Sequence, residues 1–165
     1  MVAYLYRMPA GIPGEITRTG RSVVEPNLID ANYPPTTFGS FVKIVGGLIR
    51  TIAASDAASV VYGLLVRPFP TSSTVAGQAL AAGVPSLTDP CSVLRSGYIN
   101  VKLARGTAVR GGGVGLRVTA GTHVVGEIED LTNVGAGDTD CVQVVGATFM
   151  GSADANGNVE IGFNL

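Results

Sequence analysis

Four stretches of this chain alternate apolar and polar residues with a period of two. They read GYINVKL (97–103), GVGLRVT (113–119), DCVQVVG around Val142 and NVEIGFNL (158–165). A strand turns successive side chains to opposite faces, so a strand with one buried face shows this alternation. The pattern predicts an all-β chain. Short strands, Gly-rich turns and almost no helix favour a β-sandwich or a small β-barrel.

The alternation also predicts which side chains face the core, because a shift by one residue would exchange core for solvent. The expected core set is Ile99, Val101, Leu103, Val114, Leu116, Val118, Val159, Ile161, Phe163 and Leu165. Further strands are expected at 41–45 and 48–52, joined as a hairpin by Gly46 and Gly47, and at 60–66, where a continuous apolar run indicates burial on both faces. A short helical turn is expected within 53–59, and Asn156–Gly157 marks a hairpin before the last strand.

Residues 1–37 are rich in proline and are interpreted as an extended N-terminal arm, followed by a single β-rich domain over 38–165. Proline lacks the N–H that a central strand needs, which restricts this region to edge strands and extended crossings. The tip of the arm carries Tyr4, Leu5, Tyr6 and Met8. Such a tip either docks on a partner or adds an edge strand to its own domain.

Charged residues make up 14% of the chain and hydrophobic residues 46%, against roughly 25% charged in an ordinary soluble domain. A surface so poor in charge leaves apolar patches that burial against other subunits would cover. The net charge of −1, with scattered Lys and Arg, predicts no nucleic-acid partner. No apolar run has the roughly 18 residues of a membrane span, and the first residues lack the features of a secretory signal, so synthesis in the cytoplasm without export is expected.

Few residues are able to carry chemistry. His123 is the single histidine and has no nucleophile motif nearby, so it is assigned no role. The run GGGVG (111–115) lacks the Lys-Ser/Thr of a phosphate loop and is interpreted as a hairpin turn. Cys91 and Cys141 form no zinc motif; a disulfide between them stays open, although free thiols are preferred.

Two groups of acidic residues are candidate sites for glycoside hydrolysis or calcium binding. Glu127, Glu129 and Asp130 form the first, and Asp138 and Asp140 form the second. Alternation places Glu127 and Glu129 together on a solvated face. Glu127, Asp138 and Asp140, the carboxylates that a hydrolase would use, are expected to be dispersed. The segment SADANGNVE (152–160) departs from the full calcium-loop pattern and is interpreted as a turn. We therefore expect no enzyme, metal site or cofactor.

Several segments together resemble the structural cement, or head decoration, proteins of tailed bacteriophages. They are MPAGIPGEITR (8–18), VYGLLVRPFPT (61–71), GYINVKL followed by GTAVRGGGVGLRV (106–118), and ADANGNVEIGFNL (153–165). The resemblance implies a protein of the virion that binds the outside of the mature head at junctions between capsomers and stabilises the shell. Its partner would be the major capsid protein, and it would act as a homo-oligomer, with a trimer preferred over a dimer.

The expected capsid contacts are Tyr4, Tyr6, Arg7 and Met8 in the arm, because large apolar side chains with an arginine are enriched at interface anchors. Arg67, at the end of the most apolar strand, is a further candidate; it could equally cap carbonyls within its own domain. The alternative function is a β-sandwich surface module that binds a glycan or a host receptor.

Overall fold

The computed structural model describes residues 11–68, 83–131 and 140–164, and strands dominate them. The described residues form nine strands and two short 3₁₀ helices, η1 (Thr19–Arg21) and η2 (Ala58–Val60). No helix among them is long and apolar enough to cross a membrane. The strands are β1 (Val23–Asn27), β2 (Phe41–Val45), β3 (Leu48–Thr51), β4 (Gly63–Val66), β5 (Cys91–Arg105), β6 (Gly113–Arg117), β7 (Ile128–Asp130), β8 (Cys141–Phe149) and β9 (Asn158–Phe163).

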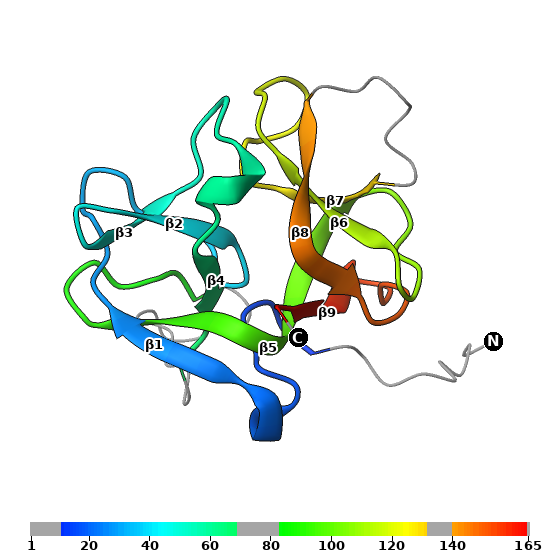
Figure 1. Ribbon diagram of the computed structural model, residues 1–165, viewed down its shortest axis with the longest axis horizontal. Helices are drawn as coiled ribbons and strands as arrows, with labels where there is room; N and C mark the ends of the chain where they lie inside the picture. The colour runs from blue at the N-terminus through cyan, green and yellow to red at the C-terminus, as the bar shows by residue number, and fades with distance from the viewer. Residues whose placement is uncertain (1–10, 69–82, 132–139, 165) are drawn as a thin grey trace.

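The long strand β5 belongs to two sheets that lie side by side (Figure 1). Its second half closes a barrel in the order β5-β7-β6-β8-β9, because β9 returns to pair with β5. Its first half pairs with β1 on one edge and with β4 on the other. β4 also pairs with β2, whose other neighbour in the sheet is β3. The predicted all-β class is therefore confirmed, with a closed barrel as its core.

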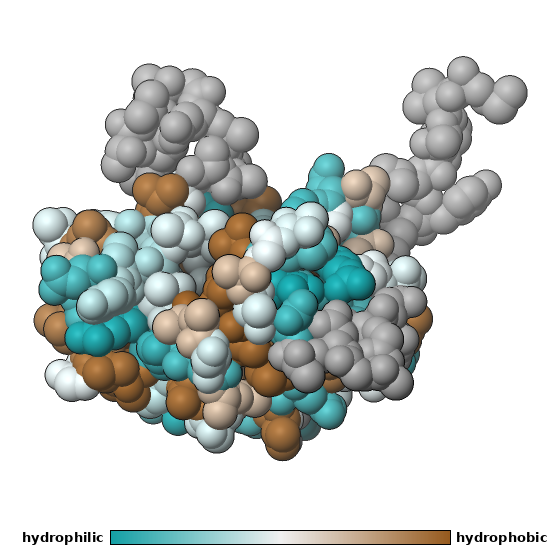
Figure 2. All heavy atoms as spheres, turned by 90° about the horizontal axis from the view of Figure 1, so that it is seen from above, coloured by the Kyte–Doolittle hydropathy of each residue, from teal (hydrophilic) through white to brown (hydrophobic). Residues whose placement is uncertain are grey.

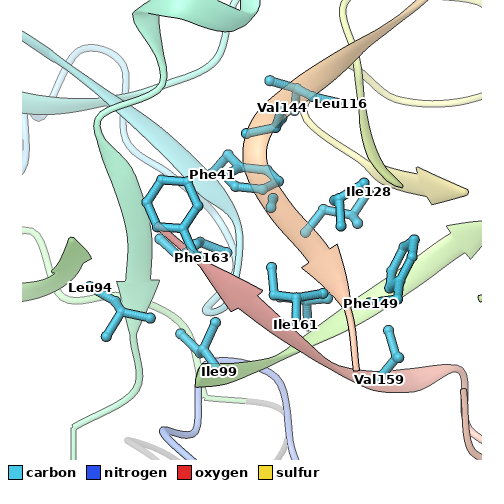
Figure 3. Packing of buried hydrophobic residues seen from close by; sticks show 14 of the residues in the cluster. Phe41, Leu94, Ile99, Leu116, Ile128, Val144, Phe149, Val159, Ile161 and Phe163 are labelled. Atoms are coloured by element: carbon cyan, nitrogen blue, oxygen red, sulfur yellow. The ribbon is translucent and has the colours of Figure 1, made fainter. Parts of the chain in front are cut away.

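The predicted core faces are largely confirmed. Side chains from both sheets meet in one cluster, whose members point toward one another in Figure 3. A smaller cluster of six buried residues lies in the part of the molecule that contains β2, β3, β4 and the first half of β5. Leu103 is only partly buried, and Leu165 lies outside the described residues. The fully buried members of the predicted set are Ile99, Val101, Val114, Leu116, Val159 and Ile161.

Two predicted hairpins are present. β2 and β3 pair in antiparallel register around Gly46 and Gly47, whose φ angles of 60° and 80° suit residues without a Cβ. The connection from β8 to β9 ends in a turn in which Asp154 Oδ1 accepts the amides of Asn156 (2.9 Å) and Asn158 (2.8 Å). Segment 152–160 is thus a side-chain-capped turn, as predicted.

Other local predictions need correction. Only the first glycine of GGGVG lies in a turn, because Gly113–Gly115 already belong to β6. The turn does not join a hairpin of consecutive strands, since β6 pairs with β7 and β8 while the second half of β5 pairs with β9. The strand predicted over 60–66 begins only at Gly63, because η2 occupies Ala58–Val60. All four residues of β4 are buried, as a strand covered on both faces requires.

Residues 11–37 lie against the domain. β1 adds an edge strand to β5, and the following segment bonds to β3 through the bridge Ile29–Ile49. The boundary near residue 37 stays a prediction. Cys91 and Cys141 are both free thiols.

Candidate functional site

Residues 11–18, which we call the arm root, run as an added strand segment along β5. The Gly14 amide donates to the Asn100 carbonyl (2.8 Å), the Asn100 amide donates to the Glu15 carbonyl (2.9 Å), and the Thr17 amide donates to the Tyr98 carbonyl (3.1 Å). These bonds use the edge of β5 that β9 leaves open. The ten preceding residues therefore start from a fixed point on the domain.

Side chains also fasten the arm root to the barrel. Arg18 Nε and Nη2 donate to the two carboxylate oxygens of Glu160 at 3.1 and 2.7 Å. Its guanidinium lies over the Tyr98 ring, 4.0 Å from the centroid. At the other end, Asn158 Nδ2 donates to the Gly11 carbonyl (3.0 Å). The contact with Glu160 raises the pKa of Arg18, which keeps this residue cationic.

Arg67 binds the arm root of its own chain, where it caps a carbonyl. Its role as a capsid contact stays a prediction. The residue is 7% exposed, its Nε donates to the Pro13 carbonyl (3.0 Å), and its amide donates to the Gly14 carbonyl (2.8 Å). The guanidinium stacks on Phe38 at 4.6 Å. Burial lowers the pKa of Arg67. The other predicted contacts, Tyr4, Tyr6, Arg7 and Met8, lie outside the described residues, so their role stays a prediction.

The close contact between Arg67 and the arm root requires a glycine at position 14. Gly14 has φ 88°, and a Cβ there would lie 2.6 Å from Phe38 Cβ and 3.0 Å from the Arg67 amide nitrogen. Any other residue would be strained and would push the two segments apart.

A cleft of about 550 Å³ opens beside the arm root. Its walls are mostly apolar, and it lies between the loop before β2 and the segment before β7. Three charged residues, Arg67, Lys102 and Glu127, line it among apolar and small neighbours that include Pro13, Phe41 and Val124. Such a lining suits an apolar segment better than a charged ligand.

Glu129 does not lie on a solvated face, so that expectation is wrong. The dispersal expected of Glu127, Asp138 and Asp140 stays a prediction, because Asp138 lies outside the described residues. Glu127 and Glu129 share a face, as alternation predicted, but Glu129 is fully buried. The guanidinium of Arg117 bonds both of its oxygens, with Nη2–Oε2 at 3.2 Å, and a further nitrogen of Arg117 lies 3.5 Å from Asp140. The sequence interpretation missed this pair because Arg117 lies on β6 and Glu129 on β7, and alternation within each strand does not show that these strands pair.

This cluster is a structural ion-pair network. His123, Glu127 and Glu129 bring possible ligand atoms within 4.8 Å of one another. A cation placed there would meet the Arg117 guanidinium, which already neutralises Glu129 and would repel a metal. Asp130 is also buried, and its Oδ2 accepts the Thr107 amide at 3.3 Å. Asp138 lies outside the described residues.

The outer surface exposes several apolar side chains, as expected from the small share of charged residues in the sequence. Figure 2 shows apolar side chains reaching solvent at several places between hydrophilic ones. The most exposed is Val145, at 84%, where β8 passes from β6 to β9. Apolar groups on a surface with few charges indicate contacts with other proteins.

Comparison with known proteins agrees with a role in binding other proteins. The sequence matches the family described as "Structural cement protein (E217 gp24/Pam3 gp6)" over residues 2–164. The chain belongs to this family of phage structural cement proteins. The family role is structural and associates this cement protein with the capsid of the virion.

One solved structure supports the fold of the cement protein. A chain of the structure titled "The capsid of Myoviridae Phage XM1" superposes with a TM-score of 0.68. It is 18% identical, and the match covers 98% of this chain and 95% of that chain. At this identity the likeness shows a shared fold. No curated protein sequence matches significantly.

Proposed function

We propose that this cement protein binds the outer surface of the mature phage head at junctions between capsomers and stabilises the shell. Its direct partner is the major capsid protein, and it acts as a symmetric homo-oligomer. The observation that carries the proposal is the family match over nearly the whole chain. The resemblance to a chain from a phage capsid supports it.

Adhesion alone accounts for the stabilisation. A protein that binds the expanded shell and not its precursor shifts the equilibrium toward the expanded state. Each copy that bridges two or more capsid subunits forms its later contacts at high effective concentration, so modest interfaces hold firmly. A charge-poor surface suits this role because little charge has to be desolvated on contact.

The N-terminal tip makes part of the contact with the shell in this proposal. Tyr4, Tyr6, Arg7 and Met8 supply large side chains and one guanidinium, a composition enriched at interface anchors. The arm root fixes the point from which the tip starts, which lowers the entropy lost on docking. Arg67 acts indirectly, by holding Pro13 and Gly14 in place.

Reconstitution on heads that lack the protein tests the proposal. Purified wild-type protein is added to expanded heads, and occupancy and the temperature of DNA release are measured. We expect saturable binding and a higher release temperature. A variant lacking residues 2–8 should bind at least roughly tenfold more weakly, while a control lacking only residues 2–3, which keeps Tyr4, should bind as wild type.

Each outcome separates the alternatives. Equal binding of both truncations would remove the tip from the interface. Absence of binding to heads, together with saturable binding of the free protein to glycans, would replace the cement role with recognition of a host surface.

A further inference from the structure

The turn between β8 and β9 places a chemically labile dipeptide at the surface of the molecule. Asn156 is exposed and is followed by Gly157, whose φ is 75°. Asparagine is a thermolabile residue, because the main-chain nitrogen of the next residue can attack its side-chain amide. Glycine offers the least hindered nitrogen for this attack, since it has no Cβ.

A second turn of the chain has the same construction and serves as a comparison. Residues 30–33 read DANY, and residues 154–157 read DANG. In each turn the aspartate side chain accepts the asparagine amide, at 2.8 Å in the first and 2.9 Å in the second. The amide of the fourth residue donates to the aspartate carbonyl, at 3.2 and 2.9 Å respectively. Both asparagines are exposed, so the residue that follows and the surroundings of each turn distinguish them.

Lys102, on β5, lies against the DANG turn. Its ammonium group donates to the Asn156 carbonyl, and Nζ lies 3.4 Å from the place where a Cβ of Gly157 would be. This carbonyl and the Gly157 nitrogen belong to one peptide group, so charge left on the nitrogen by loss of its proton is shared with the carbonyl oxygen. A cation bonded to that oxygen stabilises the charge. Lys102 therefore favours the form of the peptide group that attacks.

The same turn limits how often the attack occurs. The Gly157 amide donates to the Asp154 carbonyl, so its proton leaves only when this bond opens. An exposed turn opens far more often than the barrel unfolds. The Leu103 amide donates to the Gly157 carbonyl (2.8 Å), which keeps the dipeptide beside β5. The reaction therefore belongs to the folded protein and is slow.

We propose that Asn156 is a site of deamidation in the folded protein, activated by Lys102. The Gly157 nitrogen gives its proton to water and bonds to Cγ of Asn156, and the side-chain nitrogen takes up a proton and leaves as ammonia. Water then opens the five-membered imide at either carbonyl, which gives aspartate or isoaspartate at position 156. The net charge of −1 becomes one unit more negative. The reaction needs no shell, so it occurs or fails independently of shell binding.

The isoaspartate product would loosen the arm root. It adds one carbon to the main chain between positions 156 and 157, just before Asn158. Asn158 donates its main-chain amide to Asp154 Oδ1 (2.8 Å) and its side-chain amide to the Gly11 carbonyl (3.0 Å). A longer main chain displaces Asn158 from both acceptors, so the modification acts on the segment that holds the tip.

Ageing of the purified folded protein in mildly alkaline buffer tests the site. Peptide mapping by mass spectrometry follows the conversion of each asparagine to the acid, and an isoaspartyl methyltransferase labels the isoaspartate form. We expect position 156 to convert while Asn32, in the DANY turn, stays an amide. An Asn156 as durable as Asn32 would overturn the proposal.

Substitutions of Lys102 test the activation. Hydrogen exchange of the Gly157 amide reports how often the turn opens, so the conversion rate is compared with this exchange rate. Lys102→Met should lower the ratio of the two rates roughly threefold or more, as expected for a charge contact at an exposed site. Lys102→Arg keeps the charge and should leave the ratio nearly as in wild type. An unchanged ratio in Lys102→Met would overturn the role of the lysine.

Hydrogen exchange of the Gly14 amide tests the effect on the arm root. Protein that carries isoaspartate, separated by ion exchange, should exchange this amide faster than unmodified protein. Freshly purified Asn156→Asp is the control, because it has the new charge without the longer main chain, and it should exchange as wild type does. Equal exchange in the isoaspartate form and the control would refute the link to the arm root.

Discussion

Arg18 and Glu160 stand 142 positions apart in the sequence and form a two-point ion pair that ties the arm root to β9. The Arg18 side chain is 52% exposed, so solvent weakens the contribution of the pair to global stability. Its role is local, because it holds the segment from which the tip of the arm begins.

Replacing Arg18 with alanine should therefore loosen the arm root more than it destabilises the domain. We expect a loss of less than about 1 kcal/mol in the free energy of unfolding. Hydrogen exchange of the Gly14 and Thr17 amides should accelerate, since both bond to β5. Arg110→Ala, at an exposed site, is the control; equal exchange in the two variants would show that the ion pair does not hold the segment.

Gly14→Ala should detach the arm root. The φ of 88° and the 2.6 Å approach to Phe38 Cβ leave no space for a methyl group, so a loss of about 1–3 kcal/mol is expected. Urea denaturation measures the stability, and faster tryptic cleavage after Arg18 reports the detachment. Gly20→Ala is a matched control, because its Cβ meets nothing within 4 Å. Similar behaviour of the two variants would argue against the close contact.

The buried pair of Arg117 and Glu129 should be sensitive to removal of one partner. Arg117→Met leaves Glu129 buried, with Arg105 more distant at 3.8 Å among the described residues, and should cost about 3–5 kcal/mol in urea denaturation. Adding Glu129→Leu should recover most of the loss, since no charge then remains buried. A double variant no more stable than Arg117→Met would mean that the charges are not the cause.

Acid stability should depend on Asp30. The Asn32 amide, 2.8 Å from Oδ1, lowers the pKa of Asp30 below its ordinary 3.8; burial opposes this shift, and Arg50 reinforces it. Because the folded pKa lies below the unfolded one, the stabilisation is complete above the unfolded pKa and is lost as pH falls through the folded value. Asp30→Asn should therefore show a flatter decline of Tm in acid than wild type. Asp89→Asn, at an exposed site, should decline as wild type does, and an unchanged slope in Asp30→Asn would refute the assignment.

Local patterns predicted the strands of the barrel well. The alternation of 158–163 gave the correct core face of β9, because a period of two leaves no other way to bury Val159 and Ile161 together. The Gly46–Gly47 turn was predictable for the same kind of reason, since its chemistry is contained in two adjacent residues.

Pairing between distant strands was not predictable from these patterns. GGGVG looked like a hairpin because neighbouring strands usually pair, yet β6 bonds to β7 and β8. The prediction that Glu129 lies on a solvated face was wrong for a similar reason. Alternation indicates the direction of a side chain but not which other residues cover it.

The amino-acid order alone determined the all-β class, the strand faces and the shortage of surface charge, since each follows from residues close together in the chain. Tertiary structure decided that β5 serves two sheets, that Arg67 and Glu160 anchor the arm root, and that β1 pairs with β5. These features depend on contacts between residues far apart in sequence. Such contacts exist only once the whole chain has folded, because the energy of many weak interactions together selects one pairing of the strands.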